Sequence, residues 1–231
     1  DFQAGGAAGF RAAAQAGDGE MDKLRGRFTS EEIETLRSAV ANVEAQTSSE
    51  LVPMIVGRSD SYPGVVWKSS LGMTLIGAAV FALLMPHVEA FWVALTLPAW
   101  AILGRLLAAW PAWVRWWAGD ATLDDEVHQR ALQAFVELDM ASTTGRSVVL
   151  IFFSLLEHRV EIIADHGIYQ KVERDGWERT VQESVEQVKQ AGVMPGVLHA
   201  VSRVGAVLAQ HFPRKAGDAN EIPDRVVILD A

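Results

Sequence analysis

The sequence predicts an α/β domain whose chain is interrupted by a transmembrane helical hairpin. Two long apolar runs without charge, residues 69–86 and 90–104, lie in the middle of the 231-residue chain. Patterns typical of helices and strands occur on both sides of these runs. Because each flanking part is too small to cover a sheet alone, we expect the two parts to share one sheet. Two separate soluble modules are the alternative.

The apolar runs have the length that a membrane span requires. The first, residues 69–86, contains 18 residues, which as a helix span about 27 Å, close to the thickness of the hydrocarbon core. The second reaches a full span if it continues to Trp110, with Arg105 extending toward the headgroups. The alternative is a buried hairpin in a soluble core. A signal peptide is excluded by the position of the runs in mid-chain.

Tryptophan is concentrated around these runs. Seven of the eight Trp residues lie between positions 67 and 117. Indole rings favour the boundary between lipid and water, where the ring is in an apolar environment and the N–H stays hydrated. We therefore expect residues 110–117 to lie along the membrane surface. The predicted interfacial residues are Trp67, Trp92, Trp110, Trp113, Arg115, Trp116 and Trp117.

The flanking charges predict an orientation. Arg58 and Lys68 precede the first run, and Arg105 and Arg115 follow the core of the second, whereas the connecting turn around Glu89 contains no Lys or Arg. Because basic residues remain in the cytoplasm, both soluble parts are expected there and the turn outside.

Composition excludes several kinds of site. The chain has no Cys, so it forms no disulfide, thiolate metal site or cysteine nucleophile. With 29 acidic and 20 basic residues its net charge is −9. Without a basic stripe, nucleic acid is not an expected partner. The spacings of a phosphate-binding loop, a zinc-hydrolase helix and a nucleophile elbow are also missing.

The N-terminal part begins with a low-complexity tail. Residues 1–20 include seven Ala and five Gly, and Met21 is an alternative start, so these residues are either native or an extension. A helix follows, with Thr29 and Glu32 forming a capping box. Residues 50–57 predict a strand in which Pro53 favours an edge position or a bulge. The expected division is a tail over residues 1–27, a first domain part over 28–66, the hairpin with its interfacial segment over 67–118, and a second domain part over 119–231.

The second part predicts a helix, a β-hairpin and two further helices. Apolar residues recur at helical spacing over residues 123–140. Residues 147–153 form a continuous apolar run that is typical of a buried strand, and residues 159–164 are expected to pair with them. Helices are expected over residues 177–190 and 195–210. The C-terminal residues predict either a short strand or a surface segment.

Four groups of residues resemble those of the TPM domain family. No single group is diagnostic, and the resemblance depends on their order and spacing along the chain. They are FTSEE at 28–32, EAQTSSEL at 44–51, TGRSVVLIFFSL at 144–155 and HRVEIIADHGI at 158–168. The closing residues HFP at 211–213 and NEIPDR at 220–225 are similar to those of a bacterial branch of membrane proteins in which a two-helix hairpin interrupts the domain.

The resemblance implies an α/β sandwich with a central mixed sheet flanked by helices. It also implies a role as an accessory protein that interacts with and stabilises a membrane protein complex, so that the expected partners are the lipid bilayer and another integral membrane protein. The expected location is the bacterial inner membrane, with the soluble domain on the cytoplasmic side. A weak calcium-dependent acid phosphatase is the alternative, and an enzymatic role is the less favoured of the two.

Three carboxylates are the candidate ligands for the calcium ion of this alternative function. Glu50 opens the first strand, Asp60 follows that strand, and Asp165 follows the third. Carboxylate oxygens suit hard cations such as calcium. If the strands of Asp60 and Asp165 run parallel, the two side chains approach each other. The alternative interpretations are a solvated acid for Glu50, a polar linker for Asp60 and an ordinary turn for Asp165. No catalytic residue is assigned.

Overall fold

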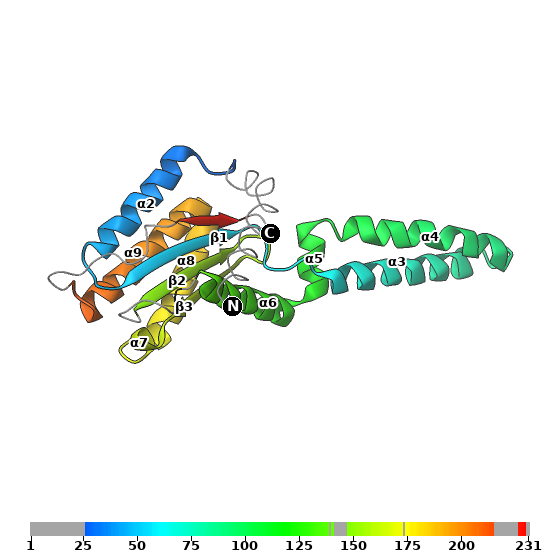
Figure 1. Cartoon of the computed structure of the whole chain (residues 1–231). Helices are drawn as coiled ribbons and strands as arrows, with labels where there is room; N and C mark the ends of the chain where they lie inside the picture. Colours follow the sequence, from blue (N-terminus) through cyan, green and yellow to red (C-terminus); the bar gives the residue numbers. More distant parts are fainter. Residues whose placement is uncertain (1–25, 139, 141–146, 173, 215–225, 230–231) are drawn as a thin grey trace, which may run out of the picture. The chain divides into compact units, whose positions relative to one another are not determined.

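The computed structural model describes residues 26–138, 140, 147–172, 174–214 and 226–229. Within these ranges the elements are α2 (Ser30–Glu44), β1 (Glu50–Val56), α3 (Pro63–Leu84), α4 (Ala90–Leu107), α5 (Pro111–Ala118), α6 (Asp120–Glu137), β2 (Val148–Ser154), β3 (Arg159–Ala164), α7 (His166–Tyr169), α8 (Arg174–Ala191), α9 (Val193–His211) and β4 (Val227–Leu229). Figure 1 shows these elements along the chain. Residues 1–25 of the predicted tail and residues 220–225 lie outside the described residues.

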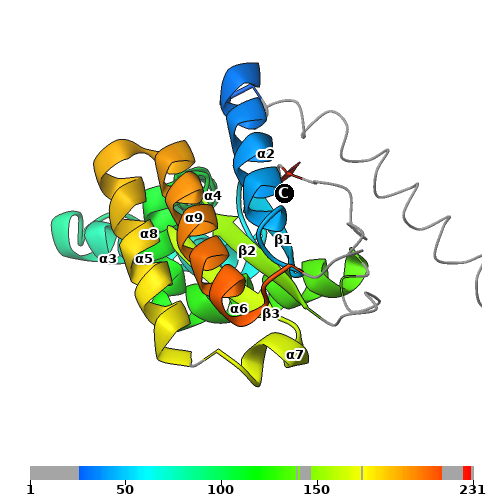
Figure 2. The same cartoon turned by 90° about the vertical axis from the view of Figure 1, so that its left-hand side faces the viewer.

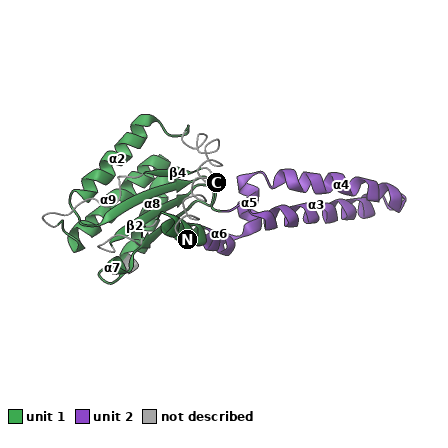
Figure 3. Cartoon of the chain, in the orientation of Figure 1, with its two compact units in different colours: residues 1–59, 127–231 green, residues 60–126 purple. Residues whose placement is uncertain are grey.

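The chain divides into two compact units, which Figure 3 colours separately. Unit 1 contains residues 1–59 and 127–231, and unit 2 contains residues 60–126. Unit 1 holds the described strands and is therefore built from segments on both sides of the apolar helices. Unit 2 holds α3, α4, α5 and the beginning of α6.

The four strands of the described residues form one mixed sheet in the order β3-β2-β1-β4. β1 pairs in parallel with β2 along its whole length, from Glu50 opposite Val148 to Val56 opposite Ser154. β4 is parallel to the end of β1, and β3 is antiparallel to β2. The predicted β2–β3 hairpin is confirmed, and so is the mixed sheet flanked by helices.

Helices cover both faces of this sheet, as the two views in Figures 1 and 2 show. On one face α2, α8 and α9 pack against Leu51 and Ile55 of β1 and their neighbours on β2 and β3. On the other face α6 packs against Val52 and Met54 of β1. Successive residues of a strand point to opposite faces, so β1 and β2 contribute to two separate cores. Their continuous apolar sequences are explained by burial on both faces.

Pro53 lies in a central strand, so the predicted edge position is wrong. Along β1 the N–H groups point alternately toward the two neighbouring strands, and that of Glu50 bonds to Ser147 on the β2 side. The nitrogen of Pro53 therefore faces the other side, where pairing with β4 begins only at Met54. A proline fits this position because the N–H that it lacks is not required by the described pairing.

The first helix begins where its capping box predicts. The Thr29 hydroxyl accepts a hydrogen bond from the Glu32 N–H at 3.1 Å, and the Glu32 carboxylate accepts one from the Thr29 N–H at 2.7 Å. These bonds satisfy donors that a helix N-terminus otherwise leaves unpaired. Leu36 and Val40 then face the sheet and are fully buried.

A close contact between α2 and α9 gives a testable prediction. A Cβ at Gly205 would lie 2.4 Å from a methyl carbon of Val43, whereas one at Gly176 of α8 would meet nothing within 4 Å. We expect Gly205→Ala to lower the free energy of unfolding by about 1–3 kcal/mol through overpacking. Gly176→Ala should raise it by up to about 1 kcal/mol through helix propensity. Chemical denaturation of both variants checks this, and equal effects would contradict the proposed contact.

Candidate functional site

The apolar hairpin of unit 2 is the most distinctive surface of the described chain. α3 has 22 residues and α4 has 18, and both are long and apolar enough to cross a membrane. Most of their large side chains are exposed within the structure, including Leu83 at 80% and Phe91 at 67%. Monomeric soluble proteins rarely expose a continuous apolar surface of this kind. The two helices are therefore suited to an apolar environment.

Small residues bring α3 and α4 close together. A Cβ at Gly77 would lie 2.5 Å from the Trp100 ring, and one at Gly104 would lie 2.5 Å from the Ser69 carbonyl oxygen. The Ser69 hydroxyl donates a hydrogen bond to the Gly104 carbonyl at 2.7 Å. Close backbone approach and polar contacts of this type are how helices associate in lipid. Sequence reasoning did not single out Ser69 and Gly104, because a lone Ser or Gly is common in apolar helices.

The predicted interfacial residues fall into two groups. Trp67, Trp92, Trp110 and Trp116 are each more than half exposed. Trp113 and Trp117, in contrast, are partly buried within unit 2. The Trp113 indole N–H donates to the Ser69 hydroxyl at 2.8 Å, and the Trp117 ring lies against Gly72. Arg115 is also partly buried and has a polar partner. Trp113 and Trp117 thus join α5 to α3.

A buried carboxylate holds the last residue of unit 1 before the hairpin. Glu157, in the turn between β2 and β3, is fully buried. It accepts hydrogen bonds from the Ser154 hydroxyl and, at 2.9 Å, from the Ser59 N–H. The hydroxyls of Ser59 and Ser154 lie 2.8 Å apart. The cluster fixes where the chain leaves the sheet. Nothing in the sequence marks Glu157, since a single Glu in a short turn is normally solvated.

Asp60 shapes the connection into α3. Its carboxylate accepts a hydrogen bond from the Tyr62 N–H at 2.6 Å. Tyr62 adopts the left-handed conformation with φ 51°, which is uncommon for a non-glycine residue. Its side chain is buried, and Pro63 begins the helix. Asp60 therefore has a structural role in this turn.

The other two candidate carboxylates lie at one end of the sheet. Glu50 begins β1 opposite Val148, and the Asp165 N–H bonds to the Val148 carbonyl at 2.9 Å. Glu50 and Asp165 thus flank Val148, about 10 Å apart across two strand spacings. Asp60 follows the opposite end of β1. The condition for an approach of Asp60 to Asp165, that their strands run parallel, is not met, because β3 runs antiparallel to β2 and so ends where β1 begins.

The Asp165 side chain also caps a short helix. One oxygen accepts a hydrogen bond from the His166 N–H at 2.5 Å, and the other is buried without a hydrogen-bond partner in the described structure. Glu50 and Asp165 could supply two oxygen ligands to a hard cation. Among the described residues, no group of three or more His, Asp or Glu side chains is arranged to hold a metal ion.

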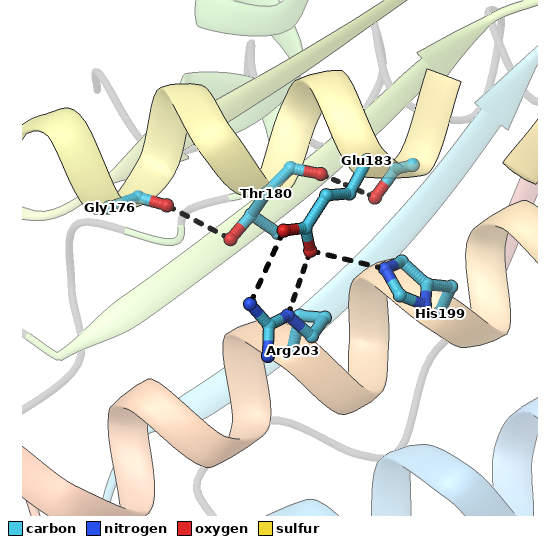
Figure 4. Close-up of polar contacts among 6 residues, drawn as sticks. Gly176, Thr180, Glu183, His199 and Arg203 are labelled. Atoms are coloured by element: carbon cyan, nitrogen blue, oxygen red, sulfur yellow. Dashed lines mark hydrogen bonds and ion pairs between the residues drawn. The ribbon is translucent and has the colours of Figure 1, made fainter. Parts of the chain in front are cut away.

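Polar contacts join α8 to α9 beside the main core, as Figure 4 shows. The Glu183 carboxylate lies 3.0 Å from the Arg203 guanidinium and 3.5 Å from the His199 ring. Behind it, the hydroxyls of Thr180 and Ser184 bond to carbonyls of their own helix at 3.0 and 2.7 Å. The ion pairs of Glu183 are partly exposed and join α8 to α9, whereas Thr180 and Ser184 are buried. These contacts bring together no nucleophile and base.

Comparison with known proteins extends the fold description only. No family model matches the chain, and no curated protein matches it. Among solved structures, the chain is similar to the NMR structure of the BA42 protein from the psychrophilic bacterium Bizionia argentinensis, with a TM-score of 0.55. The alignment covers 87% of this chain and 94% of that chain at 20% identity. A likeness at this identity supports the fold and not an activity.

Glu126 gives a pH-dependent prediction at the boundary of unit 2. Burial, followed by the charges of Asp60 and Asp125, raises the pKa of Glu126 above its ordinary value of 4.5. The folded chain therefore keeps the Glu126 proton at a higher pH than the unfolded chain does. The free energy of unfolding then falls as the pH rises from the ordinary pKa of 4.5 through the raised pKa of the folded state. We expect Glu126→Gln to raise the unfolding temperature at pH 7 and to change it little at pH 4.

Thermal unfolding of the purified chain in a non-ionic detergent, followed from pH 4 to pH 8, checks this. The comparison at low pH, where the parent carboxyl is protonated, is the internal control. A difference in unfolding temperature between the variant and the parent that is the same at all these pH values would contradict the raised pKa of Glu126.

Proposed function

We propose that the chain is a two-pass membrane protein whose α/β domain serves as an accessory module for another integral membrane protein. The observation that carries the proposal is the exposed apolar hairpin between β1 and β2. Because β1 pairs with strands from beyond the hairpin, the anchor is built into the folding unit. A removable anchor would stand at one end of the domain instead.

The free energy of solvation supports a lipid environment for the hairpin. Fully burying one Leu, Ile or Phe side chain contributes about 1.5–3 kcal/mol, and α3 and α4 expose many such side chains. Within the helices the backbone groups bond to one another, as a bilayer requires. The polar contact of Ser69 with Gly104 is likewise internal.

The distribution of charge supports the orientation. Lys68 lies near the start of α3, and Arg105 and Arg115 lie near the end of α4 and within α5. The turn between α3 and α4 carries Glu89 and no Lys or Arg. Under the positive-inside rule, the α/β domain is cytoplasmic and the turn faces outward. In a bacterium this corresponds to the inner membrane.

The chemistry of the hairpin favours an accessory role over transport. Residues 69–84 and 90–104 contain no ionisable side chain, so they provide no intramembrane proton relay or ion ligand of the usual kind. A calcium-dependent acid phosphatase has less support than an accessory role. Its carboxylates Glu50 and Asp165 lie at one end of the sheet without a third ligand among the described residues, and Asp60 follows the other end.

The orientation can be tested with single cysteines, since the chain has none. We expect Glu89→Cys in intact cells to react with a membrane-impermeant maleimide, because the turn faces outward. Ser38→Cys, at an exposed position on α2, should react only after the cells are opened. The reverse pattern would overturn the orientation, and release of the chain by alkaline carbonate would overturn membrane insertion.

The accessory role can be tested by crosslinking in native membranes. A membrane-permeable amine crosslinker followed by mass spectrometry should recover one integral membrane protein reproducibly, in comparable amount to the chain. Dissolving the membranes in a strong detergent before crosslinking is the control and should abolish the product. Recovery of the chain alone, or only of its own oligomers, would contradict the accessory role.

A further inference from the structure

A surface depression in unit 1 lies beside β3, the edge strand of the sheet. It has a volume of about 440 Å³ and is lined by residues of α6, β3 and α8 together with Tyr169. This volume is within the range of about 300–1,000 Å³ that is typical of ligand sites. The polar residues that line it are His128, Glu161, Tyr169, Glu178 and Gln182, and Trp177 contributes its indole.

The backbone of β3 is only partly satisfied along this side. Asp165 bonds to β2, so by alternation Val160, Ile162 and Ala164 direct their N–H and C=O groups away from β2. The Tyr169 hydroxyl accepts a hydrogen bond from the Ala164 N–H at 3.3 Å and lies 3.5 Å from the Ile162 carbonyl oxygen. Tyr169 thus covers the end of this edge, and among the described residues its first half has no other hydrogen-bond partner.

Trp177 adds an unsatisfied donor to the same depression. Trp177 is buried, with only 5% of the residue exposed. The indole N–H is buried and has no hydrogen-bond partner in the described structure. Buried polar groups are nearly always paired, so an unpaired donor in a ligand-sized depression indicates a missing acceptor. A carbonyl oxygen is the usual acceptor for an indole N–H.

The ionisable residues that line the depression are mainly acidic. Glu178 is exposed at the start of α8, and Glu161 lies on β3 with its carboxylate 3.0 Å from the His128 ring. None of the described residues that line the depression is Lys or Arg. A ligand with positive charge is therefore complementary to it.

We propose that this depression binds an extended peptide segment with alternating basic side chains, added as a strand along the outer edge of β3. The backbone of the segment would pair with the open half of β3, and one of its carbonyls would accept from Trp177. Its basic groups, which share one face of the added strand, would lie on the α8 side and face Glu178. Strand addition to a free edge is a common mode of peptide recognition. The inference rests on the proposed accessory function, because it gives the chemistry of the partner's docking segment.

The test measures binding of a fluorescein-labelled peptide of alternating Val and Lys to the full chain in a neutral nanodisc. Fluorescence anisotropy should show saturable binding, and the same peptide with Glu in place of Lys should not bind. Glu178→Gln should weaken binding about tenfold through loss of one charge-assisted contact. Glu186→Gln is the matched control, since Glu186 is exposed on α8 outside the depression, and it should leave the affinity unchanged.

A second variant separates the donor from the charge. Trp177→Phe keeps an aromatic ring and removes the N–H, and we expect about fivefold or greater weakening, with circular dichroism confirming that the variant is folded. The proposal would be overturned if the acidic and basic peptides bound with equal affinity, or if Glu178→Gln and Glu186→Gln weakened binding equally. Unchanged affinity in both Glu178→Gln and Trp177→Phe would also overturn it.

Three further outcomes distinguish this proposal from a second copy of the chain and from the accessory function. If sedimentation shows a dimer of the chain that Glu178→Gln dissociates, a second copy occupies the edge and the peptide proposal fails. If crosslinking recovers a membrane partner but the basic peptide does not bind, the accessory function stands and this docking mode is wrong. Peptide binding without a membrane partner would support the groove and contradict the accessory role.

Discussion

The parallel pairing of β1 with β2 is the constraint on which the rest of the structure depends. Parallel strands need a long crossover connection, because the chain must return to the same end of the sheet before it continues. Here the crossover comprises residues 57–147 and includes both apolar helices as well as α6. Part of α6 does what a crossover helix ordinarily does, since Val127 and Ala131 cover one face of the sheet. The hairpin is thus an insertion in a connection that the sheet requires in any case.

This arrangement explains where polar contacts are concentrated. An insertion in a crossover is tolerated only if the strands before and after it keep their register. The Glu157 cluster fixes the chain just beyond β1, and Asp60 forms the turn that leads into α3. Both acids stabilise the backbone at the point where the insertion begins. A polar residue at such a junction is therefore a poor guide to catalysis.

Much of the fold could be predicted from the sequence, because local patterns there agree with tertiary structure. The capping box at Thr29, the apolar runs of β1 and β2, and the length of the two apolar helices each have one main physical interpretation. Pro53 was misinterpreted because its effect depends on which side of the strand its nitrogen faces. The pairing with β2 directs that nitrogen toward β4, whose pairing begins one residue later.

The site was harder to predict, since it depends on strand directions and on contacts distant in sequence. Glu50 and Asp165 share one end of the sheet only because β3 is antiparallel to β2. Glu157 meets Ser59 across nearly a hundred residues, and Trp177 meets the edge of β3 through the packing of α8. No local pattern in the sequence contains such information. The position of the tryptophans around the hairpin showed a general tendency, but it did not separate Trp113 and Trp117 from those that are exposed.

The central position of β1 has a consequence for biosynthesis. At typical rates of synthesis of 5–20 residues per second, β2 leaves the ribosome roughly 5–20 s after β1. During this interval a very apolar strand has neither of its parallel neighbours, while the hairpin that follows it is already emerging. Both apolar helices are therefore synthesised before the sheet can be completed. Until β2 and β4 follow, an unpaired β1 is a segment exposed to aggregation or to chaperones.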